Sequence, residues 1–422
     1  MDVEMFDTAL RTVPEGGVTS AKGFKAAGIH AGFRKDPDRP DFALVCTEKP
    51  VPCAGVFTQN RFCAAPVTVS RQNLGGGNGY GRVQAVAINS GNANAATGEP
   101  GLACARETCD IVSQIIGCES DQVIVASTGV IGEQLSVNEF ETGVPDAVSR
   151  LSRRGGADAA RAIMTTDTHP KECAMSYESH DLEYAGCTFT VGGMCKGSGM
   201  IMPNMATMIA VLTTDAPVAP ETLHGLLADC VGQTFNKVTV DSDTSTNDTC
   251  VLLASGAAAK GMPPIEEGTE AYEELSYTLL AVCEVLARAM AADGEGASRL
   301  VTVNVTGAVD DAQADLAARA VANSPLVKTA IAGHDCNWGR IAMALGKSGA
   351  EFHQEDVSID LMGIPVCRGG LAVPFDEDEA LRRFEDGEIV ISADLGAGAG
   401  SATVWTCDMT HEYIHINADY RS

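Results

Sequence analysis

Residues 192–215 read GGMCKGSGMIMPNMATMIAVLTTD and lie at the middle of the 422-residue chain. The first part is rich in glycine and contains one lysine, Lys196, and one proline, Pro203. An apolar run begins abruptly at Thr207, and such a run favours a buried strand. Glycine adopts backbone conformations that other residues avoid, so a tight loop is expected before that strand. Taken alone, the pattern requires no chemistry, because a glycine loop that leads into a buried strand explains it.

Two kinds of periodicity alternate on either side of this segment. Apolar residues recur at helical spacing over 102–116, 223–231 and 275–286, whereas residues 301–306 alternate apolar and polar side chains as a strand does. Segments 122–126 and 388–393 are predicted to be short buried strands. Strands interleaved with helices indicate the α/β class. Loops are predicted from glycine, proline and acidic residues at 36–40, 74–79, 261–268 and 375–386.

The composition excludes several classes of function. The chain has 56 acidic and 29 basic residues, a formal net charge of −27 at pH 7. This charge repels phosphate backbones and anionic lipid headgroups, so binding to nucleic acid or to a membrane surface is not expected. No run approaches the roughly 18 apolar residues of a membrane span. The length favours two or three domains or lobes, but no change in composition marks a boundary.

The fifteen cysteines indicate a reducing compartment. Their number is odd, no C-x-x-C is present, and the opening MDVEMFD lacks the basic and apolar regions of a signal peptide. We therefore expect a cytoplasmic protein in which most thiols pack as small apolar side chains. Cys195 would be reactive if the adjacent Lys196 lowered its pKa, although a packed thiol is the favoured interpretation.

Four short motifs resemble known sites and fail on their context. Residues 411–415, HEYIH, match a zinc-binding H-E-x-x-H, but the alternation over 405–416 predicts a C-terminal strand, which would place the histidines two pleats apart. GKS at 346–348 lacks the first glycine of a phosphate loop. GAGAG at 396–400 is one residue short of a dinucleotide fingerprint and predicts a turn after a strand. DSDTS at 241–245 lacks the later Gly and Glu of a calcium loop. No metal site is expected.

Ten blocks in order give a more specific signal. The blocks span the chain nearly end to end: 16–19 with 22–24, 55–60, 88–95, 126–132, 164–168, 196–200, 243–248, 294–297, 337–340 and 416–420. By these blocks the chain resembles the ornithine acetyltransferase family, also called glutamate N-acetyltransferases, the self-cleaving enzymes of the cyclic arginine pathway.

The resemblance implies a fold and a processing step. The implied fold is an αββα-layered sandwich of the self-processing ornithine acetyltransferase and aminopeptidase type. Cleavage is implied at the Ala206–Thr207 bond, which would leave an α chain of residues 1–206 and a β chain of residues 207–422. The two fragments would be intertwined in one folded unit and associate as an α2β2 heterotetramer.

The resemblance also implies the roles of individual residues. Thr207 would be the nucleophile, and its new α-amine, with an ordinary pKa of about 7.7–8.0, can act as base for its own hydroxyl. The Thr128 hydroxyl and the Gly129 backbone N–H would form the oxyanion hole. Lys196 suits a substrate carboxylate and Glu295 an ammonium group. The implied substrate contacts are Thr165, Lys196, Thr207, Glu295, Asn417 and Ser422.

The implied reaction moves an acetyl group from N2-acetyl-L-ornithine to L-glutamate through acetyl-Thr207, without a cofactor. Some family members also accept acetyl-CoA as acetyl donor, and this activity stays open here. The first alternative is an N-terminal-threonine amidohydrolase or aminopeptidase on the same scaffold, in which water replaces glutamate. The second is an unprocessed binding or structural protein that keeps the glycine loop for packing.

Overall fold

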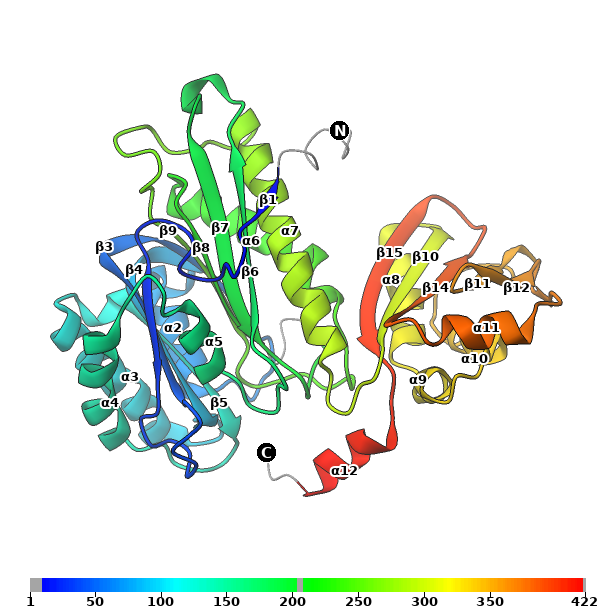
Figure 1. The fold of residues 1–422 in the computed structure, drawn as a ribbon, viewed down its shortest axis with the longest axis horizontal. Helices are drawn as coiled ribbons and strands as arrows, with labels where there is room; N and C mark the ends of the chain where they lie inside the picture. The colour runs from blue at the N-terminus through cyan, green and yellow to red at the C-terminus, as the bar shows by residue number, and fades with distance from the viewer. Residues whose placement is uncertain (1–9, 203–207, 420–422) are drawn as a thin grey trace.

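The computed structural model describes residues 10–202 and 208–419, and it has the predicted α/β class. A nine-stranded sheet and a six-stranded sheet are each covered by helices (Figure 1). The strands of the larger sheet are β1 (Arg11–Thr12), β2 (Lys25–Ile29), β3 (Phe42–Phe57), β4 (Tyr80–Asn92), β5 (Val123–Val130), β6 (Lys171–Glu178), β7 (Thr188–Lys196), β8 (Ile209–Thr214) and β9 (Thr249–Ala254). Its helices are α2 (Ala65–Asn73), α3 (Gly98–Ile116), α4 (Asn138–Arg150), α5 (Gly156–Ala162), α6 (Pro220–Gln233) and α7 (Glu270–Ala292).

The nine-stranded sheet has the order β1-β6-β7-β8-β9-β3-β4-β5, with β2 paired to β3. The long strand β3 joins its two halves, because the start of β3 pairs with β2 and its end pairs with β9. In Figure 1 helices α3 and α4 flank one side of this unit and α6 and α7 the other. The strands between them therefore form the middle of an αββα arrangement.

Alternate strand residues divide between an inner core and two outer cores. Val123 and Val125 of β5 pack in an outer core with α3 and α4, whereas Ile124 packs in the inner core. On the other half, Leu252 of β9 packs in the outer core with α6 and α7, whereas Val251 enters the same inner core. Strands that are apolar at every position are therefore expected, because both faces are buried.

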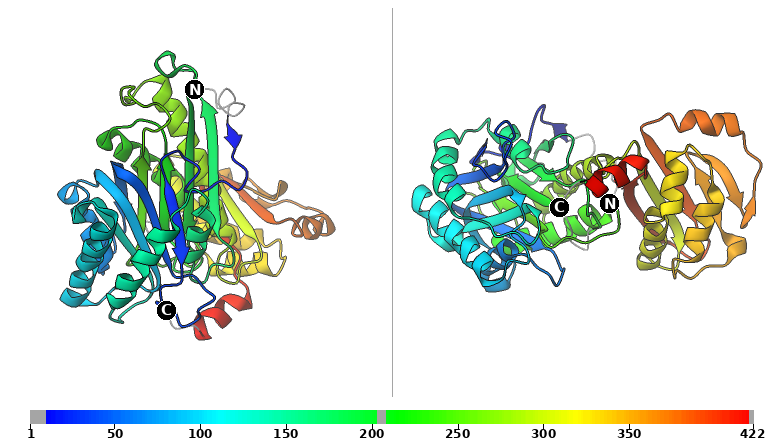
Figure 2. Two further views of the ribbon diagram at one scale, coloured as in Figure 1. Left: turned by 60° about the vertical axis from the view of Figure 1, so that its left-hand side comes forward. Right: turned by 90° about the horizontal axis from the view of Figure 1, so that it is seen from below.

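The six-stranded sheet forms a second unit with its own core, at a boundary that composition does not mark. Helix α7 and a salt bridge between Arg288 and Glu388 at 2.8 Å join the two units. Helix α12 (His411–Asp419) lies between them when the molecule is seen from below (Figure 2). The second unit contains β10 (Leu300–Ala308), β11 (Ser358–Leu361), β12 (Ile364–Arg368), β13 (Leu371–Ala372), β14 (Glu388–Asp394), β15 (Gly400–Cys407), α8 (Asp311–Ala322), α9 (Pro325–Ala332), α10 (Trp338–Gly346) and α11 (Glu377–Arg383).

Helix α7 is, within the described residues, long and apolar enough to cross a membrane by composition. Half of its most apolar window is buried, and the helix packs on β6 and β7 as a core helix does.

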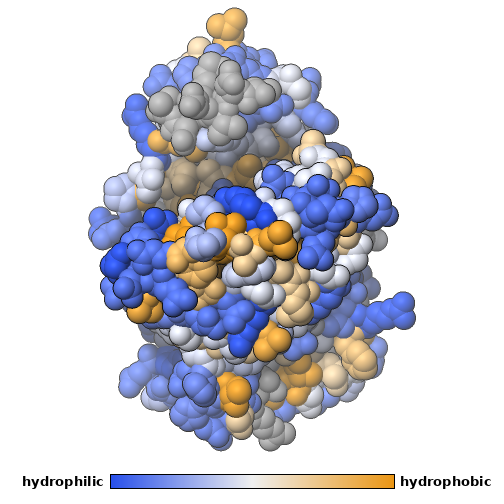
Figure 3. Space-filling view, turned by 90° about the vertical axis from the view of Figure 1, so that its right-hand side faces the viewer, coloured by the Kyte–Doolittle hydropathy of each residue, from blue (hydrophilic) through white to orange (hydrophobic). Residues whose placement is uncertain are grey.

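Figure 3 shows hydrophobic residues gathered near the middle of the face that the six-stranded unit presents. Exposed hydrophobic side chains of this unit include Val309, Leu316, Leu326, Met343, Leu371 and Leu381.

Most predicted elements are confirmed. The helical patterns correspond to α3, α6 and α7, the alternating pattern to β10, and the short apolar runs to β5 and β14. Residues 395–399 connect β14 to β15, as the turn prediction requires. Gly346 ends helix α10, so the GKS motif lies at a helix C-terminus and not at the N-terminus that a phosphate loop needs.

Two predictions of local structure are wrong. The strand predicted to continue to residue 416 ends at Cys407, and HEYIH begins helix α12, where the Thr410 hydroxyl accepts the Glu412 N–H at 3.1 Å. The predicted loop 375–386 contains helix α11, whose N-cap Asp376 accepts two backbone N–H bonds. In both segments a capping side chain favours a helix over the structure inferred from periodicity.

Candidate active site

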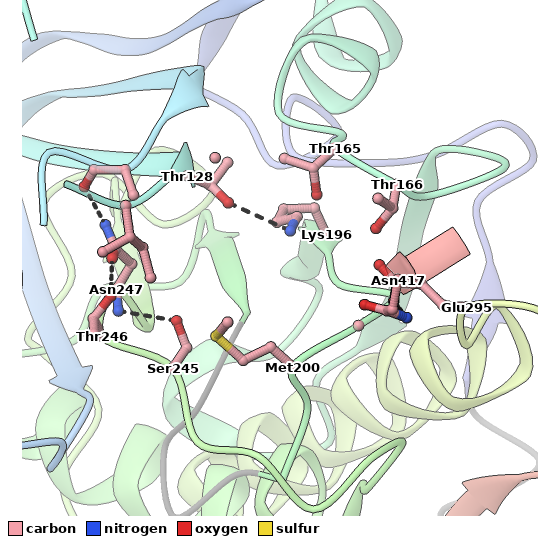
Figure 4. A pocket seen from close by; sticks show the side chains of 14 residues that line it. Thr128, Thr165, Thr166, Lys196, Met200, Ser245, Thr246, Asn247, Glu295 and Asn417 are labelled. Atoms are coloured by element: carbon pink, nitrogen blue, oxygen red, sulfur yellow. Dashed lines mark hydrogen bonds between the residues drawn. The ribbon is translucent and has the colours of Figure 1, made fainter. Parts of the chain in front are cut away.

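Six of the predicted site residues line one open pocket, which encloses about 620 Å³ including its mouth. They come from strand ends, loops and helix α12, at positions far apart in the chain (Figure 4). The other two, Thr207 and Ser422, lie outside the described residues. The six that the fold brings together are Thr128, Gly129, Thr165, Lys196, Glu295 and Asn417.

Thr128 and Gly129 occupy the C-terminal end of β5, within the strand and not in a turn after it. Gly129 has φ +134°, and a Cβ there would lie 2.3 Å from the carbonyl carbon of Gly91 on the paired strand β4. Only glycine fits this approach, because the obstacle is backbone that cannot move aside. Two rigid neighbours at a strand end are therefore presented to the pocket.

Lys196 forms the basic end of the pocket with Thr128. Its side chain leaves the end of β7 and is almost fully buried, and Nζ donates to Thr128 Oγ1 at 3.5 Å (Figure 4). Burial lowers the pKa of the Lys196 ammonium, because an ion loses hydration inside the protein. Asp167 and Glu295 oppose that shift. An incoming carboxylate would therefore meet a poorly hydrated cation.

Glu295 and Asn417 form the acidic end. Asn417 lies on helix α12, and its Nδ2 donates to Glu295 Oε2 at 2.7 Å. This bond fixes the Glu295 carboxylate. The carboxylate lies directly over Gly199, where a Cβ would come within 2.2 Å of the Glu295 carboxyl carbon. Figure 4 shows this pair across the pocket from Thr128. The pocket therefore has opposite charges at its two ends.

A buried carboxylate holds the backbone at Thr165, between the two ends. The Asp167 side chain accepts the Thr165 backbone N–H at 2.9 Å and the Gly197 N–H at 2.7 Å. Burial alone would raise the pKa of Asp167, but Lys196 and Lys171 outweigh burial and hold that pKa well below its usual range. Asp167 is therefore ionised at neutral pH.

The pocket also contains residues that sequence reasoning missed as site residues. Thr166, Met200, Ser245, Thr246 and Asn247 line it, although all fall inside sequence blocks that carried the resemblance.

The residue after Asn247 connects the pocket to the start of β8. Asp248 Oδ1 accepts the Met208 N–H at 2.7 Å, and Oδ2 has no hydrogen-bond partner among the described residues. Burial raises the pKa of Asp248 well above its usual range. The residue that follows Thr207 in the chain is thus held beside the pocket-lining loop.

Neither thiol nor metal chemistry is supported at this site. Burial raises the pKa of Cys195 to about 12, more than the neighbouring lysines lower it, so Cys195 is a packed thiol. Across 10–202 and 208–419, no group of three His, Cys, Asp or Glu side chains could hold a metal ion. On the exposed surface of α12, His415 Nδ1 lies 3.4 Å from Glu412 Oε2, and His415 Nε2 lies 3.2 Å from Asp419 Oδ2.

Comparisons with known proteins find one matching family model and relatives that share a single name. The ArgJ family matches residues 25–422. A protein named arginine biosynthesis bifunctional protein ArgJ, from Nitratidesulfovibrio vulgaris, is 46% identical over 404 residues, which cover 96% of this chain and 99% of that protein. The protein of the same name from Agrobacterium fabrum is 43% identical over 429 residues and covers both chains completely. A crystal structure of the protein of this name from Bacillus halodurans is 40% identical, with a TM-score of 0.48 over 49% of this chain and 97% of that one.

Proposed function

Because the chain belongs to the ArgJ family, we propose that it transfers an acetyl group from N2-acetyl-L-ornithine to L-glutamate in arginine biosynthesis. The products are L-ornithine and N-acetyl-L-glutamate. The enzyme would work by a ping-pong mechanism in which Thr207 carries the acetyl group between the two substrates.

The observation that carries this proposal is the convergence of six predicted residues in one pocket with opposite charges at its ends. Acetylornithine carries a carboxylate, an acetamide and a distant ammonium group. Lys196 suits the carboxylate, Glu295 with Asn417 suits the ammonium group, and Thr128 with Gly129 suits the acetamide oxygen. A substrate with both charges can therefore be oriented by both ends at once.

The nucleophile would arise by cleavage of the Ala206–Thr207 bond. The Thr207 hydroxyl attacks the Ala206 carbonyl, the amide becomes an ester as the Thr207 α-amine is released, and water hydrolyses this ester. The products are an α chain of residues 1–206 and a β chain of residues 207–422. An α-amine with an ordinary pKa of about 7.7–8.0 can accept the hydroxyl proton near neutral pH. In support, β8 and β9 lie between β7 and β3 in the sheet order, so the two fragments would stay paired after cleavage.

In the first half-reaction the Thr207 hydroxyl attacks the acetyl carbonyl, and its proton passes to the α-amine. Thr128 and Gly129 stabilise the oxyanion, the C–N bond breaks, and the departing amine of ornithine takes the proton. In the second half-reaction the neutral amine of glutamate attacks the ester and releases the Thr207 hydroxyl. No cofactor enters either step.

A second activity is favoured by the word "bifunctional" in the relatives' names. We propose acetyl-CoA as the second acetyl donor, with glutamate again the acceptor. Radiolabelled acetyl-CoA and glutamate test this, because label in N-acetylglutamate requires that activity.

The assembly is proposed as an α2β2 heterotetramer in the cytoplasm. The hydrophobic surface in Figure 3 supports association of a second copy, since contiguous apolar patches commonly mark interaction sites. Light scattering on the purified protein would give twice the precursor mass of 43.8 kDa, and the mass of one copy would contradict the assembly.

The self-processing step has a direct test. Mass spectrometry should find two fragments in the wild-type protein, one intact chain in Thr207→Ala, and slower cleavage in Thr207→Ser, which keeps a hydroxyl. Assays with acetylornithine, with and without glutamate, separate transfer from hydrolysis. Release of ornithine at a rate independent of glutamate would favour the amidohydrolase, and an intact wild-type chain would exclude self-processing.

A further inference from the structure

A buried lysine lies behind the pocket without lining it. Lys171 begins β6, and its side chain is fully buried. Nζ donates to Asp167 Oδ1 at 2.7 Å and to Asp293 Oδ2 at 2.5 Å. One ammonium group therefore bridges two carboxylates that come from different parts of the chain.

The first carboxylate organises the basic end of the pocket. Asp167 accepts the backbone N–H of Thr165 and that of Gly197, the residue directly after Lys196. These bonds fix the backbone from which the Lys196 and Thr165 side chains project.

Asp293, which carries the second carboxylate, is connected to the acidic end through its backbone. Asp293 Oδ2 accepts the Thr168 N–H at 3.1 Å, and the Asp293 carbonyl accepts the Ser198 hydroxyl at 2.7 Å. The Ser198 carbonyl in turn accepts the Glu295 N–H at 2.9 Å. The position of Glu295 thus depends on the same segment that holds Asp293.

We propose that Lys171 is a positioning residue that sets the separation between the basic and acidic ends of the pocket through Asp167 and Asp293. This inference rests on the proposed function, since the ligand must carry a carboxylate and an ammonium group at a defined spacing. Lys171 touches no substrate and acts through the two carboxylates.

Electrostatics explain why an uncharged side chain cannot replace Lys171. Burial lowers the pKa of Lys171, but Asp167 and Asp293 outweigh burial and raise that pKa, so the ammonium stays charged at neutral pH. Without it, two buried carboxylates would repel each other or share one proton. Other groups that face this cluster are Lys196, Cys195 and His169, whose Nδ1 lies 3.4 Å from Asp293 Oδ1.

The experiment compares Lys171→Met with Lys328→Met. Lys328 is equally buried in the six-stranded unit, where Nζ donates to Thr406 Oγ1 at 2.7 Å, so it controls for the loss of a buried lysine. Both variants should melt at lower temperature. Only Lys171→Met should raise KM for acetylornithine, by about tenfold or more, with kcat within about threefold of wild type.

A pH comparison separates positioning from a general loss of structure. In Lys171→Met the KM defect should be smaller at about pH 6 than at about pH 8, because a proton shared by the two carboxylates partly replaces the ammonium. His169 lies next to Asp293, so the same comparison is made in the His169→Gln background, where the difference between the two pH values should persist. A KM defect that is the same at both pH values would contradict the proposal.

A second variant keeps the inference testable if Lys171→Met does not fold. Asp293→Asn preserves shape but removes one charge, and it should also raise KM more than kcat falls. Unchanged KM in Asp293→Asn, or equal KM values for Lys171→Met and Lys328→Met, would overturn the inference. An inactive wild-type protein would instead contradict the proposed function.

Discussion

Thr128 tests the oxyanion hole at the scale of a single residue. Its hydroxyl lies at the end of β5 in the pocket, beside the Lys196 ammonium. Removing one oxyanion donor costs on the order of 10² to 10³ in kcat. Thr128→Ala should therefore lose about that factor in steady-state acetyl transfer, whereas Thr128→Ser, which keeps the hydroxyl, should stay within about tenfold of wild type. An unchanged rate in Thr128→Ala would remove this assignment.

Gly199 tests the acidic end. A Cβ at this position would meet the Glu295 carboxyl group at 2.2 Å, so the flexible side chain of Glu295 must move. Gly199→Ala should raise KM for acetylornithine about tenfold, the effect of losing one charged contact. Gly225→Ala is the matched control, because a Cβ there meets no atom within 4 Å and alanine favours helix α6. Equal KM values for the two variants would argue against a role for Glu295.

Glu172 gives the protein a pH-dependent stability. Its pKa is raised to about 7, mainly by burial; Arg161 lowers this pKa and Asp158 raises it, and neither outweighs burial. A carboxyl whose pKa is higher in the folded state favours folding at low pH, and this contribution is lost as pH rises through about 7. Glu172→Gln should remove about 1–2 kcal/mol of difference between urea unfolding at pH 5 and at pH 8, allowing for partial exposure. The role of Glu172 would be contradicted if the wild-type protein were more stable at pH 8 than at pH 5 and Glu172→Gln showed the same difference.

At the scale of elements, helix α12 serves the site more than the fold. No residue of α12 is fully buried, but Asn417 holds Glu295, and the Tyr413 hydroxyl donates to Asp241 at 3.3 Å. A chain ending at Thr410 should keep its melting temperature within about 4 °C, the shift expected for about 1 kcal/mol in a large domain. Its KM for acetylornithine should rise at least as much as in Asn417→Ala. A truncated chain with wild-type KM would show that α12 is dispensable.

Elements with one clear period could be predicted, and those that depend on caps could not. Helices α3, α6 and α7 bury one face, so their spacing is visible in the sequence. Helix α12 buries no face, and the alternation over 405–416 concealed its Thr410 cap. Helix α11 was missed because its acidic first turn resembled a loop. The site was accessible through the resemblance, whereas Lys171 was not, since its burial arises only when β6 meets the segment around Asp293.

At the scale of the whole molecule, the strands before and after the proposed scissile bond belong to one sheet. Strand β7 precedes this bond and pairs with β8 after it, and β9 pairs with β3. The molecule as a whole has a net charge of −27, but the basic end of its pocket is formed by the buried Lys196. The charge at a site can therefore differ in sign from the net charge of the molecule.

The most direct test of the account is the detection of the acetyl-enzyme. The purified protein is incubated with N2-acetyl-L-ornithine in the absence of glutamate and analysed by peptide mass spectrometry. We expect the mass of one acetyl group on the peptide that begins at Thr207, and its disappearance when L-glutamate is added. Acetyl transfer at the full rate with no acetyl group at Thr207 under either condition would contradict the mechanism.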